Sequence, residues 1–386
     1  MRTTGFGREQ GGHDACYDAV CYPDYDTFDV LPWVENTARI YVEPTFNGKP
    51  VEVYPRTIAR RLLDELKDLG YSLLTAHEHE YTVVHGDTRE PITDDNLHNA
   101  TLRNNKAMKL IYQAMRQLPK VGVDVEKAES EAGRGAYEIT YLPNFGIRAG
   151  DNAQTFKIAM KEMAVQHNYH VSFMTCPYEG EAQCALQVCH SLWAADEKTP
   201  LLYDPDEPTK LTEVGRHWIA GLLAHAPAIT VLMAPTINCL SIMQRDSRSP
   251  HVANWGMDDR TCALRVKLNG PKGTYFENRL GGGSSNPYLT LAATVAAGMD
   301  GIKRKLDLPK EQEGGTIAAG TAKIPNNMKD ALKAFLEDKV ITDAFGPEFV
   351  KAFEACKIHE MKVQEKELAK GKTDTEWQRE YYFEYL

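Results

Sequence analysis

Apolar residues in the first part of the chain recur first at helical spacing and then at strand spacing. After Pro55, four apolar residues fall on one face of a predicted helix that ends at Gly70, namely Ile58, Leu62, Leu66 and Leu69. The following segment, 73–84, reads as a strand that carries Glu78 and Glu80. Because side chains alternate along a strand, the two glutamates are predicted to project from the same face.

Similar patterns predict a mixture of helices and strands over the rest of the chain. Asn286 followed by Pro287 is a signal for a helix start, and the residues after it are apolar nearly all round, as in a buried helix over 287–302. Further helices are expected at 102–118, 152–167, 212–223, 331–336 and 348–368, and strands at 38–42, 137–141, 171–175, 185–188, 264–266 and 275–279. This succession is α+β in character.

The totals are those of a soluble globular protein. The chain has 386 residues, 42% of them apolar and 25% charged, and its net charge of −10 disfavours nucleic acid or an anionic membrane as a main partner. It contains no run of about 18 apolar residues, and residues 1–13 lack the apolar core of a signal peptide. Eight cysteines without paired CxxC spacing favour a reduced, cytoplasmic setting.

Two groups of carboxylates in strand-like surroundings are candidate cation ligands. Glu80 is grouped with Glu131 and Glu138, and Glu78 with Glu277. Carboxylate oxygens suit Mg²⁺ or Mn²⁺, and charged side chains on an inner sheet face are costly unless they hold a cation, a phosphate or each other. A solvated strand face is the alternative, and spacing alone favours that alternative.

Three other patterns have simpler explanations than chemistry. The glycine-rich run 281–285 invites comparison with a phosphate-binding loop but lacks the Lys-Ser/Thr ending, so a turn before the next helix is favoured. Cys184, Cys189 and His190 are close enough in sequence for a zinc site, and Cys189 with His190 for a cysteine nucleophile. No orienting third residue is evident for the nucleophile, and accidental grouping is favoured for both.

The order of motifs along the chain resembles that of class I glutamine synthetases. The collinear matches, which cover about residues 23–386, are Pro23-Asp24, Glu78-x-Glu80, Glu131 through Gly135 to Glu138, His190-Ser191-Leu192-Trp193, His225-Ala226-Pro227-Ala228, Pro235-Thr236-x-Asn238 and Asn286-Pro287-Tyr288. The resemblance implies a glutamine-synthetase-like catalytic fold over residues 49–386, an antiparallel sheet cleft surrounded by helices. It also implies a truncated β-grasp part with a flexible start over residues 1–48. The family's first strands, which carry an aspartate of the neighbouring subunit's ammonium site, are expected to be missing.

The same resemblance implies how the candidate residues divide between metal, nucleotide and substrate. Members of the family condense glutamate with ammonia: ATP phosphorylates the γ-carboxylate, ammonia displaces phosphate, and two Mg²⁺ or Mn²⁺ ions stabilise the transferring group. By resemblance one ion is held by Glu80, Glu131 and Glu138, and the other by Glu78 and Glu277. The residues expected near the nucleotide are Glu126, Ser191, Arg265 and Lys272. The residues expected to act on phosphate or the substrate carboxylate, if the protein is active, are Arg260 and Arg279, with Arg265 beside them.

Several departures from the family pattern fall in this same region. A metal-binding histidine is replaced by Gln187, the next histidine on that strand face by Cys189, and a nucleotide-binding arginine by Tyr275. A substrate-binding arginine is replaced by Ile242, and the glutamate that handles the ammonium proton by Arg248, which stays protonated and cannot act as a base. Loss of one such group typically costs about 10²–10⁴ in rate. Ammonia ligation at a useful rate is therefore not expected.

Other segments resemble lengsins, the glutamine-synthetase-like proteins of lens, and their invertebrate relatives. These segments are Leu142-Pro143-x-Phe145-Gly146-Ile147, Asp151-Asn152-Ala153, Gly221-Leu222-Leu223-Ala224-His225 and 291–298. That resemblance implies a homododecamer of two hexameric rings and a non-enzymatic role that involves cytoskeletal or filament proteins. Vertebrate lengsins have lost more of the carboxylates, whereas this chain keeps five glutamates, so a retained metal or nucleotide site is consistent with the sequence.

Three hypotheses therefore stay open at the level of sequence. The first is a lengsin-like pseudoenzyme with a structural or protein-binding role. The second is an ATP-dependent γ-glutamyl ligase that joins glutamate to ammonia or to another amine. The third is a scaffold that responds to metal or nucleotide without turnover.

Overall fold

The computed structural model describes residues 18–94, 98–99, 101–180, 183–242, 249–312 and 317–386. Its strands are β1 (Val20–Pro23), β2 (Asp29–Val30), β3 (Ala38–Arg39), β4 (Val42–Phe46), β5 (Lys49–Pro50), β6 (Tyr71–His85), β7 (Val125–Ser130), β8 (Ala136–Tyr141), β9 (Asn144–Phe145), β10 (Tyr169–Ser172), β11 (Ala185–Ala194), β12 (Trp255–Met257), β13 (Leu264–Lys267) and β14 (Tyr275–Gly282). Its helices are α2 (Pro55–Asp68), α3 (Thr101–Gln117), α4 (Ile147–Val165), α5 (Glu213–Ala224), α6 (Ala226–Met233), α7 (Ile237–Ile242), α8 (Pro287–Arg304), α9 (Met328–Glu337), α10 (Lys339–Phe345), α11 (Pro347–Leu368) and α12 (Asp374–Tyr382), with short 3₁₀ helices at Tyr25–Thr27 and Leu118–Val121.

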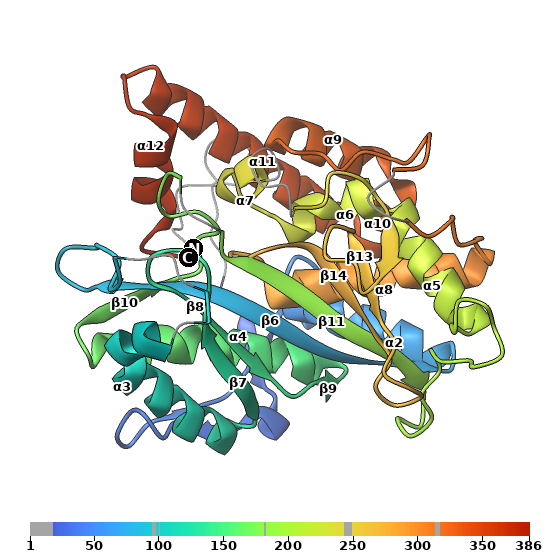
Figure 1. Ribbon diagram of the computed structural model, residues 1–386, viewed down its shortest axis with the longest axis horizontal. Coiled ribbons are helices and arrows are strands. Elements are labelled where there is room, and N and C mark those ends of the chain that lie inside the picture. Colours follow the sequence, from blue (N-terminus) through green and yellow to red (C-terminus); the bar gives the residue numbers. More distant parts are fainter. Residues whose placement is uncertain (1–17, 95–97, 100, 181–182, 243–248, 313–316) are drawn as a thin grey trace.

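A large sheet forms the centre of the molecule. Within the described residues it has nine strands, seven of them in the order β12-β13-β14-β11-β6-β8-β7, while β9 and β10 also pair with β6. The long strands β6 and β11 run side by side through the middle (Figure 1). β12 and β13 are parallel, and the other described pairs of this sheet are antiparallel. The α+β class and a mainly antiparallel central sheet are thereby confirmed.

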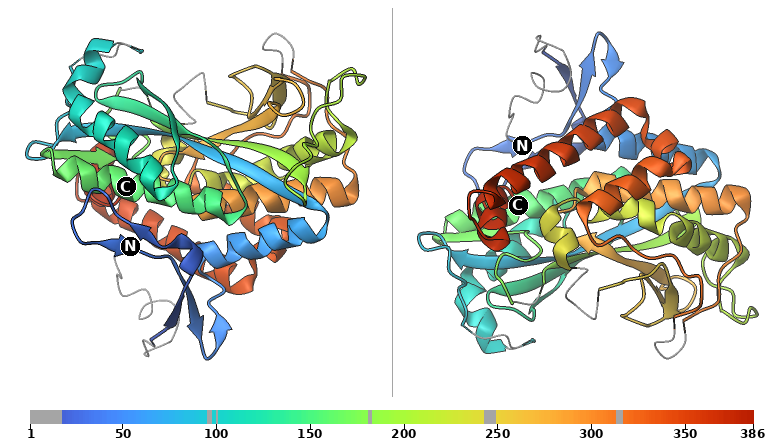
Figure 2. Two further views of the ribbon diagram at one scale, coloured as in Figure 1. Left: turned by 90° about the horizontal axis from the view of Figure 1, so that it is seen from below. Right: turned by 90° about the horizontal axis from the view of Figure 1, so that it is seen from above.

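One face of this sheet is covered by helices, and the other face is lined with carboxylates. α2, α4 and α8 lie together on the covered side (Figure 2). There the His77 Nε2 atom lies 3.0 Å from Thr290 Oγ1 of α8, and the His79 ring packs against Phe156 of α4. Because strand side chains alternate, Glu78 and Glu80 project to the opposite side, where both line the same cavity.

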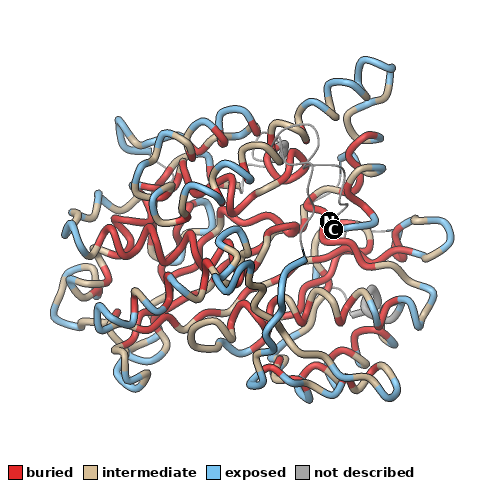
Figure 3. Tube along the Cα trace, turned by 180° about the vertical axis from the view of Figure 1, so that it is seen from behind, coloured by how far each residue is buried: buried red, intermediate tan, exposed pale blue. Residues whose placement is uncertain are grey.

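Burial follows this layered arrangement. Buried residues gather along the central strands and the helices behind them, and exposed residues are concentrated at the rim (Figure 3). A larger apolar cluster includes Trp218 and Trp255, and a smaller one includes Tyr81, Phe156 and Phe173. In the part of the chain that the structure describes, no helix is both long and apolar enough to cross a membrane.

The N-terminal strands form small sheets that a charged network ties to the body. β1, β4 and β5 make one sheet and β2 pairs with β3; these strands project from the body in Figure 2. The fully buried Arg56 of α2 contacts three carboxylates, Asp24, Glu43 and Asp151. The expected boundary between residues 48 and 49 falls inside the β4–β5 hairpin, and the division into two parts stays a prediction.

Most of the expected elements are confirmed, and the exceptions have physical reasons. α4 begins at Ile147, ahead of the expected residue 152, because Gly146 adopts a positive φ of 58° from which the helix can start at once. β7 is not among the expected strands, since its exposed Glu126 and Lys127 mask any apolar alternation. The single strand expected over 38–42 is divided between β3 and β4, and β11 extends well beyond the expected residue 188 to Ala194.

Candidate functional site

Three neighbouring strands place glutamates in one row across the cleft face of the sheet. Glu80 of β6 lies opposite Glu138 of β8, and Glu138 lies opposite Glu129 of β7. Side chains directly opposite on paired strands approach closely, and like charges in such positions repel. The register of the sheet therefore concentrates negative charge at this point.

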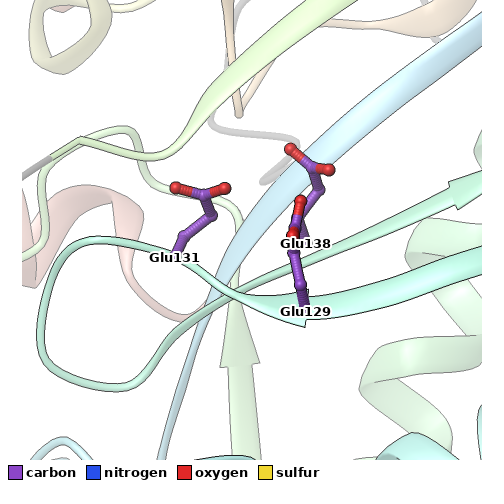
Figure 4. Close-up of side chains that lie close together, drawn as sticks. All are labelled: Glu129, Glu131 and Glu138. Carbon is purple, nitrogen blue, oxygen red and sulfur yellow. The ribbon is translucent and has the colours of Figure 1, made fainter. Parts of the chain in front are cut away.

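A compact group of possible metal ligands lies at the end of this row. One oxygen each of Glu129, Glu131 and Glu138 lies within 4.8 Å of the other two (Figure 4). Glu131 follows β7 directly, whereas the other two glutamates come from the paired strands. Lys127 Nζ contacts Glu129 and lies 3.8 Å from Glu138 Oε1, and His98 Nδ1 lies 3.0 Å from Glu131 Oε2.

Sequence analysis missed Glu129 and placed Glu80 in this group. Glu80 lines a cavity together with Glu131 and Glu138, but it is not one of the three residues whose oxygens lie within 4.8 Å of one another. The Glu129-x-Glu131 spacing matches that of Glu78-x-Glu80 and is the signal that points to Glu129. The assignment of any of these residues to a metal ion stays a prediction.

Burial and mutual repulsion disfavour the ionised forms of Glu78, Glu80 and Glu138. Burial, with the charges of Glu78 and Glu80, raises the pKa of Glu138 to about 10. Burial, with the charge of Glu131, raises the pKa of Glu80 to about 8, and burial with the charge of Glu277 raises the pKa of Glu78. A bound cation reverses this penalty, and an all-carboxylate donor set suits a hard divalent ion. The residues present therefore fit Mg²⁺ or Mn²⁺.

Glu277 of β14 is different, because it already has cationic partners. Arg265 Nη1 donates to Glu277 Oε2 at 2.8 Å, and Arg279 Nη1 contacts the other oxygen. Arg265 Nε also donates to Asp258 Oδ1 at 2.9 Å. These arginines, together with the exposed Arg260, line a cavity of about 560 Å³ that is also lined by Glu78, Glu80, Glu131 and Glu138. Arg265, which was expected near the nucleotide, lies on this side of the cleft.

β11 contributes two uncharged side chains to the cleft. Gln187 lies directly opposite Glu78 and is 6% exposed, and its Oε1 has no hydrogen-bond partner among the described residues. Cys189 lies opposite Glu277, with its Sγ 3.9 Å from Glu78 Oε2. Burial, with the charges of Glu78 and Glu277, raises the pKa of the Cys189 thiol well above its usual range. The thiol is therefore a poor nucleophile.

The zinc and cysteine–histidine alternatives find no support in the geometry. His190 points to the opposite side of β11 from Cys189, and its Nε2 accepts a hydrogen bond from Trp218 Nε1 at 3.0 Å. Cys184 Sγ lies 3.3 Å from Thr82 Oγ1. The described cysteines all have free thiols.

A second cavity, of about 340 Å³, adjoins the first. Glu78, Thr140 and Tyr275 line both cavities. The second one also receives three of the four residues that the resemblance places near the nucleotide, namely Glu126, Ser191 and Lys272. The remaining lining includes apolar surface from Leu74, Ala76 and Pro143. An apolar wall with a few polar groups at its edge suits a nucleoside.

The glycine-rich run is shaped for close packing rather than for phosphate. A Cβ on Gly281 would lie 2.2 Å from the Leu186 carbonyl oxygen, so β14 can approach β11 only without a side chain there. The Gly283 N–H donates to Thr175 Oγ1 at 3.0 Å, and Lys157 Nζ donates to the Gly283 carbonyl at 3.1 Å. Because the Gly283 and Ser285 N–H groups already donate within the protein, the turn interpretation is the one that agrees with the geometry.

Two of the substituted positions cannot be placed in the site. Ile242 is the last residue of α7, and its side chain is outside the described part of the structure. Arg248 lies outside the described residues altogether. Their roles rest on the resemblance of sequence.

Comparison with known proteins identifies the relatives of the chain. The family profile described as "Glutamine synthetase, catalytic domain" matches residues 52–379. Lengsin of Rattus norvegicus is 36% identical over 90% of this chain and 63% of its own length. Gamma-glutamylethanolamide synthetase GlnA4 of Streptomyces coelicolor is 33% identical over 85% of this chain and 72% of its own length.

A solved structure agrees with these matches. The crystal structure of a "novel glutamine synthase homolog" superposes with a TM-score of 0.83 at 26% identity, covering 97% of this chain and 86% of that one. The chain spans about 63% of the length of the rat lengsin that it matches.

Proposed function

The chain belongs to the glutamine synthetase family, and we propose that it is a cation-binding member that has lost ammonia ligation and serves as a lengsin-like structural or protein-binding component. The proposal is carried by the contrast between the two walls of the cleft. The glutamates of β6, β7 and β8 remain, whereas β11 presents the neutral Gln187 and Cys189 where the family carries histidines. Such a cleft can hold cations, but it lacks groups that the transfer reaction needs.

Glutamine synthetase family members use ATP and divalent metal ions, and we propose that this chain retains both binding capacities. Glu129, Glu131 and Glu138 would hold one Mg²⁺ or Mn²⁺, with Glu80 beside them. Glu126, Ser191 and Lys272 would contact ATP in the adjoining cavity. A bound divalent ion would screen the phosphates of the nucleotide.

The assembly and the partners are part of the same proposal. Members of the family are typically homo-oligomeric. We propose a dodecamer of two hexameric rings, in the cytoplasm, that binds cytoskeletal or filament proteins. These features follow from the lengsin resemblance.

The decisive experiment measures glutamate-dependent phosphate release from Mg²⁺-ATP or Mn²⁺-ATP in the presence of ammonium. The expected result is no release above the blank, together with a higher melting temperature when Mg²⁺-ATP is added. A Glu138→Gln variant serves as the matched control, because it removes one carboxylate from the compact group and should reduce the melting shift. Phosphate release that requires both glutamate and ammonium would overturn the proposal.

A second candidate function is an ATP-dependent γ-glutamyl ligase that uses an amine other than ammonia. It is favoured by Arg260 and Arg279, which persist in the larger cavity, and by the relative from Streptomyces coelicolor, which is named for a glutamyl amide of ethanolamine. The same assay with ethanolamine, short alkylamines and aromatic amines tests it. Release that depends on glutamate and one amine supports the ligase, and failure to bind Mn²⁺ and ATP at millimolar concentration excludes it.

A further inference from the structure

The helix α3 carries charge of one sign only. Among the described α-helices that contain lysine or arginine, it is the only one without aspartate or glutamate. Residues 96–123 as a whole contain five lysines and arginines and no acidic residue. Because the net charge of the full chain is −10, the rest of the chain carries a still larger excess of negative charge. Positive charge is thus concentrated around one helix of an acidic protein.

The two sides of α3 have different roles. One side is buried in the smaller apolar cluster, through Ala107, Leu110, Ile111 and Ala114. The opposite side is exposed, and α3 lies at the periphery of the molecule in Figures 1 and 2. Cations follow one another on this exposed side at intervals of about one or two helical turns. We call them the α3 basic face: Lys106, Lys109, Arg116 and Lys120, the last from the 3₁₀ helix that follows α3.

The charge of the α3 basic face is largely unbalanced. Lys106 Nζ lies 3.6 Å from an oxygen of Asp94, a carboxylate that is itself almost fully exposed. Lys109 and Arg116 form no ion pair with any residue that the structure describes. Burial and the charge of Lys109 together lower the pKa of the nearby His167. The positive charge of this face is therefore available to an external partner.

Apolar side chains are exposed next to these cations. Tyr112 is 47% exposed and Met115 is 38% exposed. Tyr112 lies three residues after Lys109 and four before Arg116, so on the helix surface it is a neighbour of both. Exposed tyrosine and methionine suit contact with an apolar side chain, because one offers a rigid ring and the other an adaptable thioether. The surface therefore combines charge with a place for an apolar anchor.

These features distinguish between three classes of anionic partner. A basic amphipathic helix binds a membrane by burying its apolar side in lipid, but the apolar side of α3 is already packed against the protein. A nucleic acid would extend beyond the α3 basic face, where the rest of the chain is acidic. An acidic helix of about 15 residues matches the distance from Lys106 to Lys120, which is about 21 Å along a helix. A short acidic segment of a protein fits best.

We propose that the α3 basic face, together with Tyr112 and Met115, docks an acidic segment of a partner protein. Carboxylates of the segment would contact Lys109 and Arg116, and an apolar side chain of the segment would cover Tyr112. The inference rests on the proposed protein-binding function and names the chemistry of the partner. It does not depend on cation binding, because no residue of this surface lines either cavity of the cleft.

The test measures binding of a defined probe to the purified full chain. The probe is a fluorescein-labelled peptide of about 20 residues that repeats Glu-Glu-Leu, and its matched peptide repeats Gln-Gln-Leu. Fluorescence anisotropy is recorded at about 0.1 M salt and again at about 0.5 M salt. The main variant is Lys109→Glu with Arg116→Glu. Its control is Lys333→Glu with Lys339→Glu, which changes the net charge equally at exposed positions of α9 and α10.

The expected result is micromolar binding of the Glu-Glu-Leu peptide and no binding of the Gln-Gln-Leu peptide. Binding should weaken by at least about tenfold in Lys109→Glu with Arg116→Glu and at the higher salt, and should be unchanged in the control. Tyr112→Gln should weaken binding of the Glu-Glu-Leu peptide several-fold and leave binding of polyglutamate unchanged. This last comparison distinguishes a shaped surface from general attraction between opposite charges.

Four outcomes overturn the inference. They are a wild type that does not bind the acidic peptide, an equal loss of binding in the control variant, tighter binding of oligo-dT or of phosphatidylserine vesicles than of the peptide, and a change in the mass of the oligomer in Lys109→Glu with Arg116→Glu. The last would assign the surface to a contact between copies of this chain. If that variant fails to fold, Lys109→Gln with Arg116→Gln takes its place.

Failure of this inference can be distinguished from failure of the proposed function. A wild type that binds no acidic peptide, but is stabilised by Mg²⁺-ATP without releasing phosphate, overturns the docking surface alone. Phosphate release that requires glutamate and ammonium overturns the proposed function, whatever the peptide does. The melting shift with Mg²⁺-ATP should be the same in the wild type and in Lys109→Glu with Arg116→Glu, because the two sites are separate.

Discussion

Two regions of this molecule gather buried and half-buried carboxylates, and they hold them in opposite ways. In the network around Arg56, the carboxylates of Asp24, Glu43 and Asp151 each contact an arginine. In the cleft, the glutamates of β6, β7 and β8 face mainly one another, with Lys127 and His98 at the edge. The charges nearly cancel in the network around Arg56, whereas negative charge is in excess in the cleft.

The shifts in pKa express this difference. Burial alone would raise the pKa of Asp24, but Arg56 and Arg60 lower it overall. Burial alone would lower the pKa of Arg56, but Asp151, Asp24 and Glu43 raise it overall. In the cleft, burial and the neighbouring negative charges both raise the carboxyl pKa values, to about 10 for Glu138 and about 8 for Glu80. A balanced cluster needs nothing further, whereas an unbalanced one is stabilised by a cation from solution. The first region is structural, and the second has the properties of a binding site.

The largest expected effect comes from breaking the balanced network. Arg56→Ala should lower the free energy of unfolding by about 3–5 kcal/mol, because it leaves the buried Asp151 carboxylate without its cationic partner. Chemical denaturation measures the change. Arg60→Ala is the matched control: its side chain is 38% exposed and contacts two of the same carboxylates, so the loss should be about 0–1 kcal/mol. Equal losses in both variants would contradict the assignment of Arg56 as the centre of the network.

The next effect comes from adding a divalent cation. Mg²⁺ at a hundredfold excess over its Kd should stabilise the protein by about 2.7 kcal/mol, seen as a rise of several degrees in melting temperature. A carboxyl group whose folded pKa is raised destabilises the fold as pH increases from its unfolded value toward its folded value. The metal-free protein should therefore lose stability between about pH 5 and pH 8, and Mg²⁺ should stabilise it more at pH 8 than at pH 6. A melting shift that is equal at both pH values would count against the carboxylate cluster as the binding site.

A smaller effect, on Mg²⁺ affinity, is expected for Glu129, the residue that the sequence analysis missed. Glu129→Gln should weaken Mg²⁺ binding by at least about tenfold, because it removes one of the three converging carboxylates. The exposed Asp124, which lies just before β7, provides the control Asp124→Asn, for which no change is expected. Isothermal titration calorimetry distinguishes the two. Unchanged affinity in Glu129→Gln would assign the ion to Glu80, Glu131 and Glu138, as the sequence suggested.

The smallest expected effect concerns a third cluster of carboxylates, whose negative charge is balanced only when a histidine is protonated. His225 Nδ1 lies 2.6 Å from Asp338 and its Nε2 lies 2.9 Å from Asp300. Burial alone would lower the pKa of His225, but the two aspartates raise it overall. A raised histidine pKa contributes stability that is fully present below the unfolded value of 6.5 and is lost as pH rises through the folded value.

The measurement for this cluster compares wild type with His225→Gln at two pH values. The wild type should lose roughly 1 kcal/mol more stability between pH 6 and pH 8 than the variant does, because hydrogen bonds to charged groups are the stronger ones. Identical pH dependence in the two proteins would show that His225 stays in one protonation state over this range.

How far the sequence predicts the site differs from residue to residue. The apolar stripe after Pro55 and the Asn286-Pro287 start are local signals, and α2 and α8 form where they indicate. Glu78 and Glu80 share a face for a reason that is also local. Glu129 escaped notice because its strand is polar along most of its length and presents no apolar alternation. Its place among the candidate metal ligands becomes apparent only from Glu138, which lies opposite it on β8.

The pairing of distant strands is what the sequence could not supply. The contact of Arg265 with Glu277, the position of Gln187 opposite Glu78, and the convergence of Glu129 with Glu138 all depend on register between separate strands. A shift of one residue would turn each of these side chains to the other face of the sheet.

The amino-acid sequence alone is enough to identify the family, the class of fold, the faces of single strands and helices, and the supply of carboxylates. Each of these follows from neighbouring residues or from the order of motifs along the chain. The three-dimensional packing is needed to show which carboxylates are balanced by arginine and which face one another. It is also needed to show that the Gln187 amide oxygen has no partner among the described residues. The physical reason is that charge balance depends on distances between side chains, and these distances are set by the packing of the whole sheet against α2, α4 and α8.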